Sequence, residues 1–441
     1  MKPELLMPAG DMEKMQFAFQ YGADAVYAGV PMLSLRAREN SFSIESVREG
    51  VEYAKKLGKK IYLTVNIAPH NYKIPALLKA LKPMAELKPD ALIVSDPGVI
   101  MLCKETIPEV PIHLSVQANT VNWASAKYWH KQGIERIILS REISLPEVRE
   151  IHEKNPGLEL EYFVHGSICM AYSGRCLLSN YLTYRDANQG TCAHVCRWKY
   201  KAYLEDQANP GKFMELDEDE HGAYIMNSKD MCLIEYLKEL KDAGVSSFKV
   251  EGRNKTVFYV ATIARTYRRA IDEMEAGKPF SPEHIKELAK ASNRGFFPGF
   301  LMDNPREKAQ EYEKNHTYQT HEFIGVVRAI HKILPGKNTG KDQTGNSNNP
   351  GQKLYEIEVK GRFDAPSDCE IMTPDADYIQ KIDRFFTPDG KEISTIHPGQ
   401  KDHAIFESPH DLPVGTILRK EGVKAPTPGA TPNEQKHQSK K

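Results

Sequence analysis

Apolar positions follow two alternating periods along the first half of the chain. Short runs rich in β-branched residues predict strands, and the stretches between them repeat apolar residues every three to four positions, which predicts helices. The predicted strands are residues 4–8, 24–29, 60–66, 91–95, 112–117, 136–140, 158–165 and 246–250. Predicted helices between them include residues 11–21, 44–57, 74–87 and 123–132. This order predicts an α/β fold with an eight-stranded parallel sheet closed into a TIM-like barrel, and a doubly wound open sheet is the alternative.

The pattern changes after the last of these strands. Residues 1–280 are expected to form the barrel, and residues 281–320 a helical connector. From residue 321 the helical period disappears, and short alternating runs between turn residues predict a small antiparallel β-barrel over residues 321–421. Residues 422–441 are rich in Pro, Gly, Gln and Lys, a composition that predicts a disordered tail.

Composition and charge narrow the function classes. The chain has 441 residues, of which 40% are hydrophobic and 27% charged, as is typical of a soluble globular protein. We expect a cytoplasmic protein, because the start lacks the apolar run of a secretory signal and no stretch is long and apolar enough to span a membrane. The 59 basic and 59 acidic residues cancel, which argues against indiscriminate nucleic-acid binding but leaves room for a local basic site.

One connection in the predicted barrel is much longer than the others, and it carries most of the cysteines. Residues 166–232 form this lobe, directly after a predicted strand. In a barrel of this type, the loops at the carboxyl ends of the strands build the active site. Four of the seven cysteines lie close together in the lobe, at Cys169, Cys176, Cys192 and Cys196.

The cysteine spacing favours an iron–sulfur cluster of the four-iron, four-sulfide type. Structural zinc sites usually pair ligands two to four residues apart, and only Cys192 and Cys196 meet that condition. A cluster also takes four thiolates and accepts looser spacing. Zinc and buried or redox-active thiols remain alternatives, whereas disulfides are disfavoured in a reducing compartment. Cys232 is the reserve ligand in case Cys196 is not used.

Polar side chains at the predicted strand ends point to a shared pocket. They are Asn66, Gln117, Arg141, His165, Glu251 and Arg253. Arg141 and Arg253 are suited to holding a carboxylate ligand in forked geometry. We expect His165 and Glu251 to act in proton transfer. The competing interpretation is structural, with His165 packed in the interior and Glu251 paired with a neighbouring helix.

Basic and aromatic residues interleave around the cysteines. We expect Arg175 and Arg197, together with Arg185 and Lys199, to contact substrate phosphates, while nearby tyrosines stack an unpaired base. Packing of these aromatic rings against the barrel is the alternative.

Two motifs resemble a known family. The pattern Glu161-x-Phe163-x-x-Gly166-Ser167-Ile168-Cys169, followed by Gly174-x-Cys176-x-Leu178-Ser179, resembles the signature of the collagenase-like, U32-type peptidases. The opening ELLMPAGDMEKMQFAFQYGADAVYAGV and the later FKVEGR are also similar to that family, so that the resemblance covers at least residues 1–320.

The length and the C-terminal module resemble the tRNA-hydroxylation branch most. That resemblance implies an enzyme of tRNA modification that makes 5-hydroxyuridine at the wobble position, with prephenate as co-substrate and a cysteine-held iron–sulfur cluster. It also implies tRNA as a partner and leaves room for a protein partner of the same family. Other branches act on ribosomal RNA or on quinone precursors.

A peptidase is the other activity that the family name suggests. The sequence has neither a His-Glu-x-x-His zinc motif nor a Gly-x-Ser-x-Gly nucleophile elbow. A Cys169–His165 pair could supply a nucleophile and base, but it would not explain the three neighbouring thiols.

Overall fold

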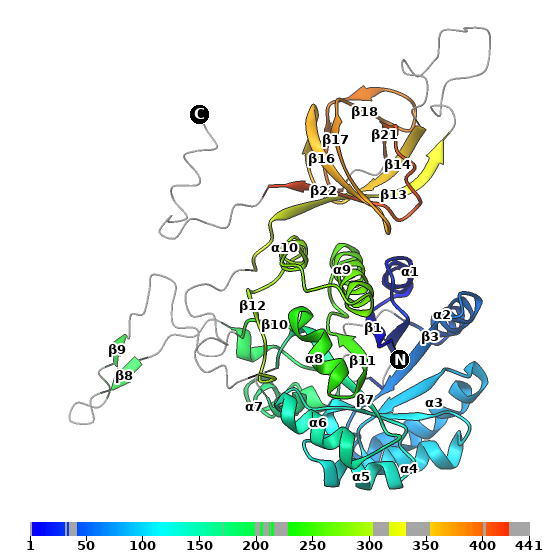
Figure 1. Cartoon of the computed structure of the whole chain (residues 1–441), viewed down its shortest axis with the longest axis vertical. Helices are drawn as coiled ribbons and strands as arrows, with labels where there is room; N and C mark the ends of the chain where they lie inside the picture. Colours follow the sequence, from blue (N-terminus) through cyan, green and yellow to red (C-terminus); the bar gives the residue numbers. More distant parts are fainter. Residues whose placement is uncertain are drawn as a thin grey trace. The chain divides into compact units, whose positions relative to one another are not determined.

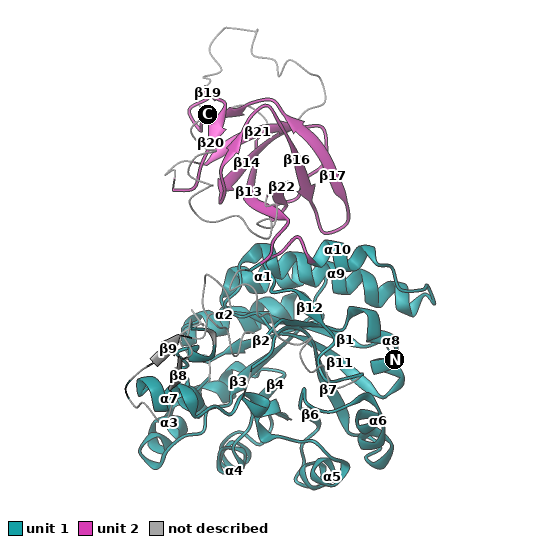
Figure 2. Cartoon of the chain, turned by 90° about the vertical axis from the view of Figure 1, so that its left-hand side faces the viewer, with its two compact units in different colours: residues 1–288, 292–317 teal, residues 289–291, 318–441 magenta. Residues whose placement is uncertain are grey.

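The chain folds into two compact units in a computed structural model (Figure 2). The structure describes residues 2–30, 33–34, 42–169, 171–198, 203–205, 211, 213–215, 228–302, 317–331, 353–399 and 403–422. The first unit comprises residues 1–288 and 292–317, and the second comprises residues 289–291 and 318–441. The predicted tail lies outside the described residues from position 423 onward.

The first unit is a closed barrel of eight parallel strands (Figure 1). Its strands are β1 (Glu4–Ala9), β2 (Ala25–Gly29), β3 (Lys60–Val65), β4 (Ala91–Val94), β5 (Ile112–Leu114), β6 (Arg136–Ile138), β7 (Glu159–Ser167) and β11 (Val245–Val250). Each pairs in parallel with the next, and β11 closes the circle by pairing with both β7 and β1. The predicted barrel is therefore confirmed, and the open-sheet alternative is wrong.

Helices surround the barrel, and most begin at a side-chain cap. They are α1 (Met12–Gln20), α2 (Ile44–Lys56), α3 (Ile74–Leu87), α4 (Pro97–Thr106), α5 (Trp123–Lys131), α6 (Leu145–Lys154), α8 (Leu237–Asp242), α9 (Val257–Glu275) and α10 (Glu283–Leu288). The Asp11 carboxylate accepts from the Lys14 backbone N–H, and Asp96 does the same for Val99. No helix of the described residues is long and apolar enough to cross a membrane.

The long connection between β7 and β11 returns to the barrel before it ends. Its first part contains the short helix α7 (Leu178–Thr183), and its last part forms β10 (Asp230–Cys232). β10 pairs antiparallel with the end of β7 and also pairs with β12 (Phe296–Phe297). Both ends of the cysteine lobe are thereby attached to the barrel at β7.

A network of charged side chains fills the barrel interior. Arg136 on β6 contacts the carboxylates of Glu4 (2.6 Å) and Glu161 (3.3 Å). On the other side of Glu161, the Lys249 ammonium lies 2.7 Å from its second oxygen. Burial raises the pKa of Glu4, but Arg136, Tyr62 and Lys60 together outweigh this effect and lower the pKa overall. Glu161 is fully buried, so that its charge depends on these two cations.

The second unit is an antiparallel sheet that curls around its own core (Figure 1). Its main strands are β13 (His321–His331), β14 (Lys353–Val359), β16 (Ser367–Met372), β17 (Asp377–Ile382), β21 (Ala404–Ser408) and β22 (Ile417–Glu421). The Gln380 amide on β17 donates to the Glu407 carbonyl on β21 (2.7 Å), which links strands from distant parts of the sheet. Apolar side chains such as Tyr355, Phe385 and Phe406 fill the interior.

The barrel network makes a stability prediction. Replacing Arg136 with Met should leave Glu4 and Glu161 buried beside an apolar side chain, at a cost of about 3 kcal/mol. The melting temperature should fall by roughly 5–10 °C. The control is Lys60→Met, because Lys60 is half exposed and lies 3.8 Å from the same Glu4 carboxylate. This variant should lose less than about 1 kcal/mol. Equal melting temperatures for the two variants would contradict a structural role for the network.

Candidate functional site

A polar cavity lies at the carboxyl ends of the barrel strands. Of the side chains predicted there, Asn66, Gln117, Arg141, Glu251 and Arg253 all line it. The cavity measures about 70 Å³, and three cations and one carboxylate of the described residues face it. The sequence therefore grouped these residues correctly, because the carboxyl ends of parallel strands meet at one end of a barrel.

The two predicted arginines are held against different aromatic rings. The Arg141 guanidinium lies 4.8 Å from the centre of the Phe163 ring and donates to the Ser167 carbonyl (3.0 Å). The Arg253 guanidinium lies 5.7 Å from the Tyr27 ring and donates to the Ser34 hydroxyl (2.8 Å). Both side chains are buried, so that their positions are fixed before a ligand binds.

The sequence interpretation missed the third cation, Lys249. Its ammonium lines the same cavity and lies 4.5 Å from the Tyr27 ring and 5.4 Å from the Phe163 ring. Burial lowers the pKa of Lys249, although the Glu161 carboxylate opposes that shift. The sequence did contain a signal for Lys249, since it lies inside a strand whose other residues are mostly apolar. A charged side chain in such a strand needs a partner.

His165 is not part of this cavity, and its predicted catalytic role meets a geometric obstacle. Phe163 pairs with Lys249 in β11 but His165 pairs with the next residue, Val250, so that β7 carries a bulge at this point. A bulge reverses which face of a strand a side chain occupies. The His165 ring consequently packs against Tyr259, Tyr267 and Phe296. Burial, with a smaller contribution from Lys255, lowers its pKa to about 3, so that it is neutral near pH 7.

The four clustered cysteines line a second cavity. Cys169, Cys176, Cys192 and Cys196 all face it, and it measures about 210 Å³. Cys232 does not line this cavity. It lies on β10, where its thiol is 3.8 Å from the Tyr267 hydroxyl and burial raises its pKa to about 11. The geometry therefore places Cys196, and not the reserve Cys232, with the other three thiols.

Hydrogen bonds hold the cysteine loops in place. The Asn188 side-chain amide donates to the Cys176 carbonyl (3.0 Å) and accepts from the Cys176 backbone N–H (3.3 Å). The Ser179 hydroxyl accepts from the Ala193 N–H (2.9 Å). The Arg185 guanidinium donates to the Cys192 carbonyl (3.0 Å). These contacts fix two of the thiol-bearing loops without using the thiols themselves.

Arg175 and Arg185 therefore have structural contacts that the sequence interpretation did not foresee. The Arg175 guanidinium donates to the Gln117 carbonyl (2.6 Å), which ties the lobe to the barrel, and Arg185 holds Cys192. Changing either side chain would disturb the cysteine lobe as well as any phosphate contact. The Arg197 side chain and Lys199 lie outside the described part of the structure.

The two cavities share a wall. Cys169 and Gly174 line both of them. The Glu142 carboxylate accepts from the Ser173 N–H (2.8 Å) and holds this wall against the barrel. Gly166, just before Cys169, has a φ of +111°, and a Cβ there would come within 2.6 Å of the Glu251 carbonyl. Glycine thus permits the chain carrying Cys169 to approach Glu251 closely.

The arrangement of the thiols bears on what the second cavity can hold. Within the described residues, no three His, Cys, Asp or Glu side chains come together closely enough to hold a single metal ion. A zinc site needs all its sulfur ligands about 2.3 Å from one ion. Four thiols around a cavity instead suit a group with several metal atoms, such as an iron–sulfur cluster. Four thiols are the donor set that an iron–sulfur cluster uses.

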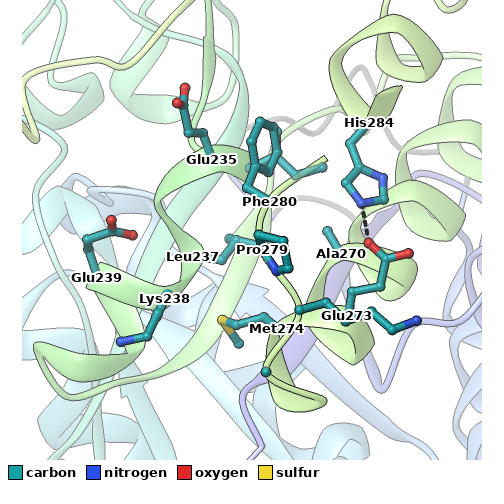
Figure 3. A pocket seen from close by; sticks show the side chains of 13 residues that line it. Glu235, Leu237, Lys238, Glu239, Ala270, Glu273, Met274, Pro279, Phe280 and His284 are labelled. Atoms are coloured by element: carbon teal, nitrogen blue, oxygen red, sulfur yellow. Dashed lines mark hydrogen bonds and ion pairs between the residues drawn. The ribbon is translucent and has the colours of Figure 1, made fainter. Parts of the chain in front are cut away.

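A third cavity lies outside the barrel (Figure 3). It measures about 230 Å³, and its lining comes from α8, α9 and the segment leading into α10. Met274, Pro279 and Phe280 face it, and the His284 imidazole lies 2.8 Å from the Glu273 carboxylate at one side. None of the residues predicted to bind or react is among those that line this cavity.

Comparisons with known proteins find several similar proteins. A protein from Escherichia coli strain K12 named "tRNA hydroxylation protein P" is 41% identical, and the match covers 95% of this chain and 96% of that protein. Bacillus subtilis has a "tRNA hydroxylation protein P1" that is 41% identical and matches over 90% of each chain. A protein from Porphyromonas gingivalis named "Collagenase" is 34% identical, covering 68% of this chain and 73% of that one.

The family model described as "Peptidase family U32" matches residues 10–311. These residues contain the barrel strands from β2 to β11, the cysteine lobe and every residue that lines the polar cavity. By this match and by the identities above, the chain belongs to peptidase family U32.

Proposed function

We propose that this protein performs or supports the hydroxylation of wobble uridine in tRNA to 5-hydroxyuridine. Prephenate is the proposed co-substrate, and a four-iron, four-sulfide cluster is the proposed cofactor. The observation that carries the proposal is the wall shared by a cation-lined cavity and a four-cysteine cavity at Cys169. The names of the E. coli and B. subtilis relatives support tRNA as the substrate, which in turn supports a cytoplasmic location.

The polar cavity suits a small dicarboxylate. Arg141, Lys249 and Arg253 face it, and Glu251 is the one acidic side chain among the described residues of its lining. Charge-assisted hydrogen bonds from guanidinium groups to carboxylates are among the strongest in proteins. A cavity of about 70 Å³ receives the acidic end of prephenate, and the ring extends toward the adjoining cysteine cavity. Glu251 is the remaining candidate for proton transfer, since His165 faces away from the cavity.

Cys169, Cys176, Cys192 and Cys196 are the proposed cluster ligands. A bound cluster would supply electron transfer. The protein's own contribution is to fix the four thiols through the Asn188, Ser179 and Arg185 contacts and to place Cys169 beside the carboxylate-binding cavity.

Aromatic side chains around α7 offer a surface for RNA bases. Tyr181 is 80% exposed, Tyr184 is 94% exposed, and Leu177, in the lining of the cysteine cavity, is 72% exposed. In contrast, Tyr162 and Phe163 are buried in the barrel, so that packing explains only part of the aromatic cluster. Exposed tyrosines stack unpaired bases irrespective of sequence. A uridine from the anticodon loop would meet these rings on its way to the shared wall.

A peptidase is the second candidate function, which the family name and the P. gingivalis relative suggest. It requires a nucleophile with a general base. Cys169 faces the cavities, but the His165 ring packs against Tyr259, Tyr267 and Phe296. The geometry therefore gives the Cys169–His165 pair no support. A protein partner of the same family remains a prediction.

The proposed cluster can be tested by metal analysis. Anaerobically purified protein should contain about four irons and four sulfides per chain. Cys169→Ser, Cys176→Ser, Cys192→Ser and Cys196→Ser should each lose iron, whereas Cys232→Ser should retain it, because Cys232 does not line the cysteine cavity. Stoichiometric zinc without acid-labile sulfide would refute the cluster. If Cys232→Ser lost its iron and Cys196→Ser kept it, the fourth ligand would be Cys232 and not Cys196.

The proposed RNA activity can be tested in cells. Mass spectrometry of tRNA nucleosides should show 5-hydroxyuridine lost in a strain that lacks this gene and restored by the parent protein. A double variant, Tyr181→Ala with Tyr184→Ala, should restore little 5-hydroxyuridine to the deletion strain. Each stacked base contributes about 1–3 kcal/mol to binding, and the variant loses both rings. Its iron content should equal that of the parent, since neither tyrosine lines the cysteine cavity.

Tyr128→Ala is the matched control. Tyr128 is 57% exposed on α5, away from the residues that line the cysteine cavity, and its removal should leave hydroxylation intact. An unchanged level of 5-hydroxyuridine in the deletion strain, together with gelatin cleavage by the purified protein, would favour the peptidase instead.

A further inference from the structure

Lys249 occupies a distinctive position among the cations of the polar cavity. Arg141 lies over the Phe163 ring and Arg253 over the Tyr27 ring, at 4.8 and 5.7 Å from the ring centres. The Lys249 ammonium lies near both rings, at 5.4 and 4.5 Å. It therefore lies near the ring that each guanidinium group packs against, in the lining of the same cavity.

The barrel network fixes this ammonium from below. Glu161 accepts from Lys249 (2.7 Å) and also lies 3.3 Å from Arg136 and 3.3 Å from the Ser247 hydroxyl. Because Glu161 already has Arg136, its negative charge is shared between two cations. Lys249 is consequently only partly neutralised, and an ammonium can donate three hydrogen bonds. Its remaining donors are available to a ligand in the cavity that Lys249 lines.

We propose that Lys249 is a ligand-binding residue that makes the cavity selective for dicarboxylates over monocarboxylates, with Glu161 as its positioning residue. This inference rests on the proposed function, which names prephenate as the acid. It adds Lys249 as a binding residue and gives a physical basis for selectivity. Arg141 binds one carboxylate of the ligand, and Arg253 binds the other. Lys249 contacts both carboxylates where they approach each other.

The charges of the cavity give the physical reason. Two carboxylates held close together repel each other, and a cation between them offsets that repulsion. Among the described residues, three cations and one carboxylate line the cavity, so that a second carboxylate on the ligand offsets more of this positive charge than one carboxylate does. An uncompensated buried charge is costly. The selectivity therefore depends on Lys249 being charged and fixed.

Gln117 indicates a second chemical group that the ligand should carry. Its side chain is 94% buried beside Gly174, where the two cavities meet, and no described residue donates a hydrogen bond to its amide oxygen. A hydroxyl group on the ligand would satisfy this acceptor. Prephenate carries two carboxylates for the cations and one hydroxyl group for the Gln117 amide oxygen.

The test compares two probes by calorimetry on anaerobically purified full-length protein. Prephenate has two carboxylates, whereas phenylpyruvate has one and a similar ring. The parent should bind prephenate more tightly. Lys249→Met should weaken prephenate binding about ten- to hundred-fold, the usual effect of losing a hydrogen bond to a charged group, and should change phenylpyruvate binding much less. Arg141→Ala and Arg253→Ala should weaken both probes.

Lys60→Met is the matched control, because Lys60 contributes to the same network through Glu4 but lies at the opposite end of β3 from the cavity. It should bind both probes like the parent. Iron content and melting temperature are measured for every variant. Lys249→Met should fold, since Glu161 keeps Arg136 as a partner. If that variant is unstable, Lys249→Gln provides the same comparison with a polar tip.

A variant without Lys249 that still prefers prephenate as the parent does would overturn the inference. Equal losses for both probes would also overturn it, because they would show general binding and not selectivity. This outcome is separable from the tRNA assay. Lys249-dependent prephenate binding without 5-hydroxyuridine in cells would contradict the proposed function alone, and 5-hydroxyuridine formed without such binding would contradict the inference alone.

Discussion

The buried carboxylate of Glu161 sets the constraint on which the rest of the barrel depends. A fully buried carboxylate is stable only with cations and hydrogen-bond donors around it. Arg136 on β6 and Lys249 on β11 supply the cations, and Ser247 supplies a hydroxyl donor. Because Arg136 also contacts Glu4 on β1, the network links β6 and β7 to β1 and is complete only when the barrel is closed. The same contacts hold the Lys249 ammonium, which lines the polar cavity.

The end of β7 connects this interior to the cysteine lobe. Glu161 and Phe163 face inward, the bulge then turns His165 outward, and Gly166 brings the chain against Glu251. Three residues later, Cys169 lines both cavities. A single strand thus carries the buried carboxylate, an aromatic wall of the polar cavity and the first of the clustered thiols. This geometry makes the proposed acid-binding cavity and the proposed cluster site neighbours.

The sequence predicted the parts of this arrangement that depend on periodicity. Alternating strands and helices specified the barrel, and parallel strands necessarily brought Asn66, Gln117, Arg141, Glu251 and Arg253 to one end. The position of His165 could not be predicted in the same way, because a bulge of one residue leaves no mark on the pattern of a buried strand. Lys249 was missed for a related reason, since its partner Glu161 lies 88 positions earlier in the chain. The contacts of Arg175 and Arg185 with backbone carbonyls also depend on tertiary structure alone.

The central claim is that the acid-binding cavity and the cysteine-held cluster adjoin at Cys169. Electron paramagnetic resonance of the reduced protein, recorded with and without saturating prephenate, tests it most directly. The account predicts that prephenate changes the spectrum of the cluster, because a ligand in the polar cavity lies against one of the cluster's own thiolates. An identical spectrum in the presence of bound prephenate would contradict the account.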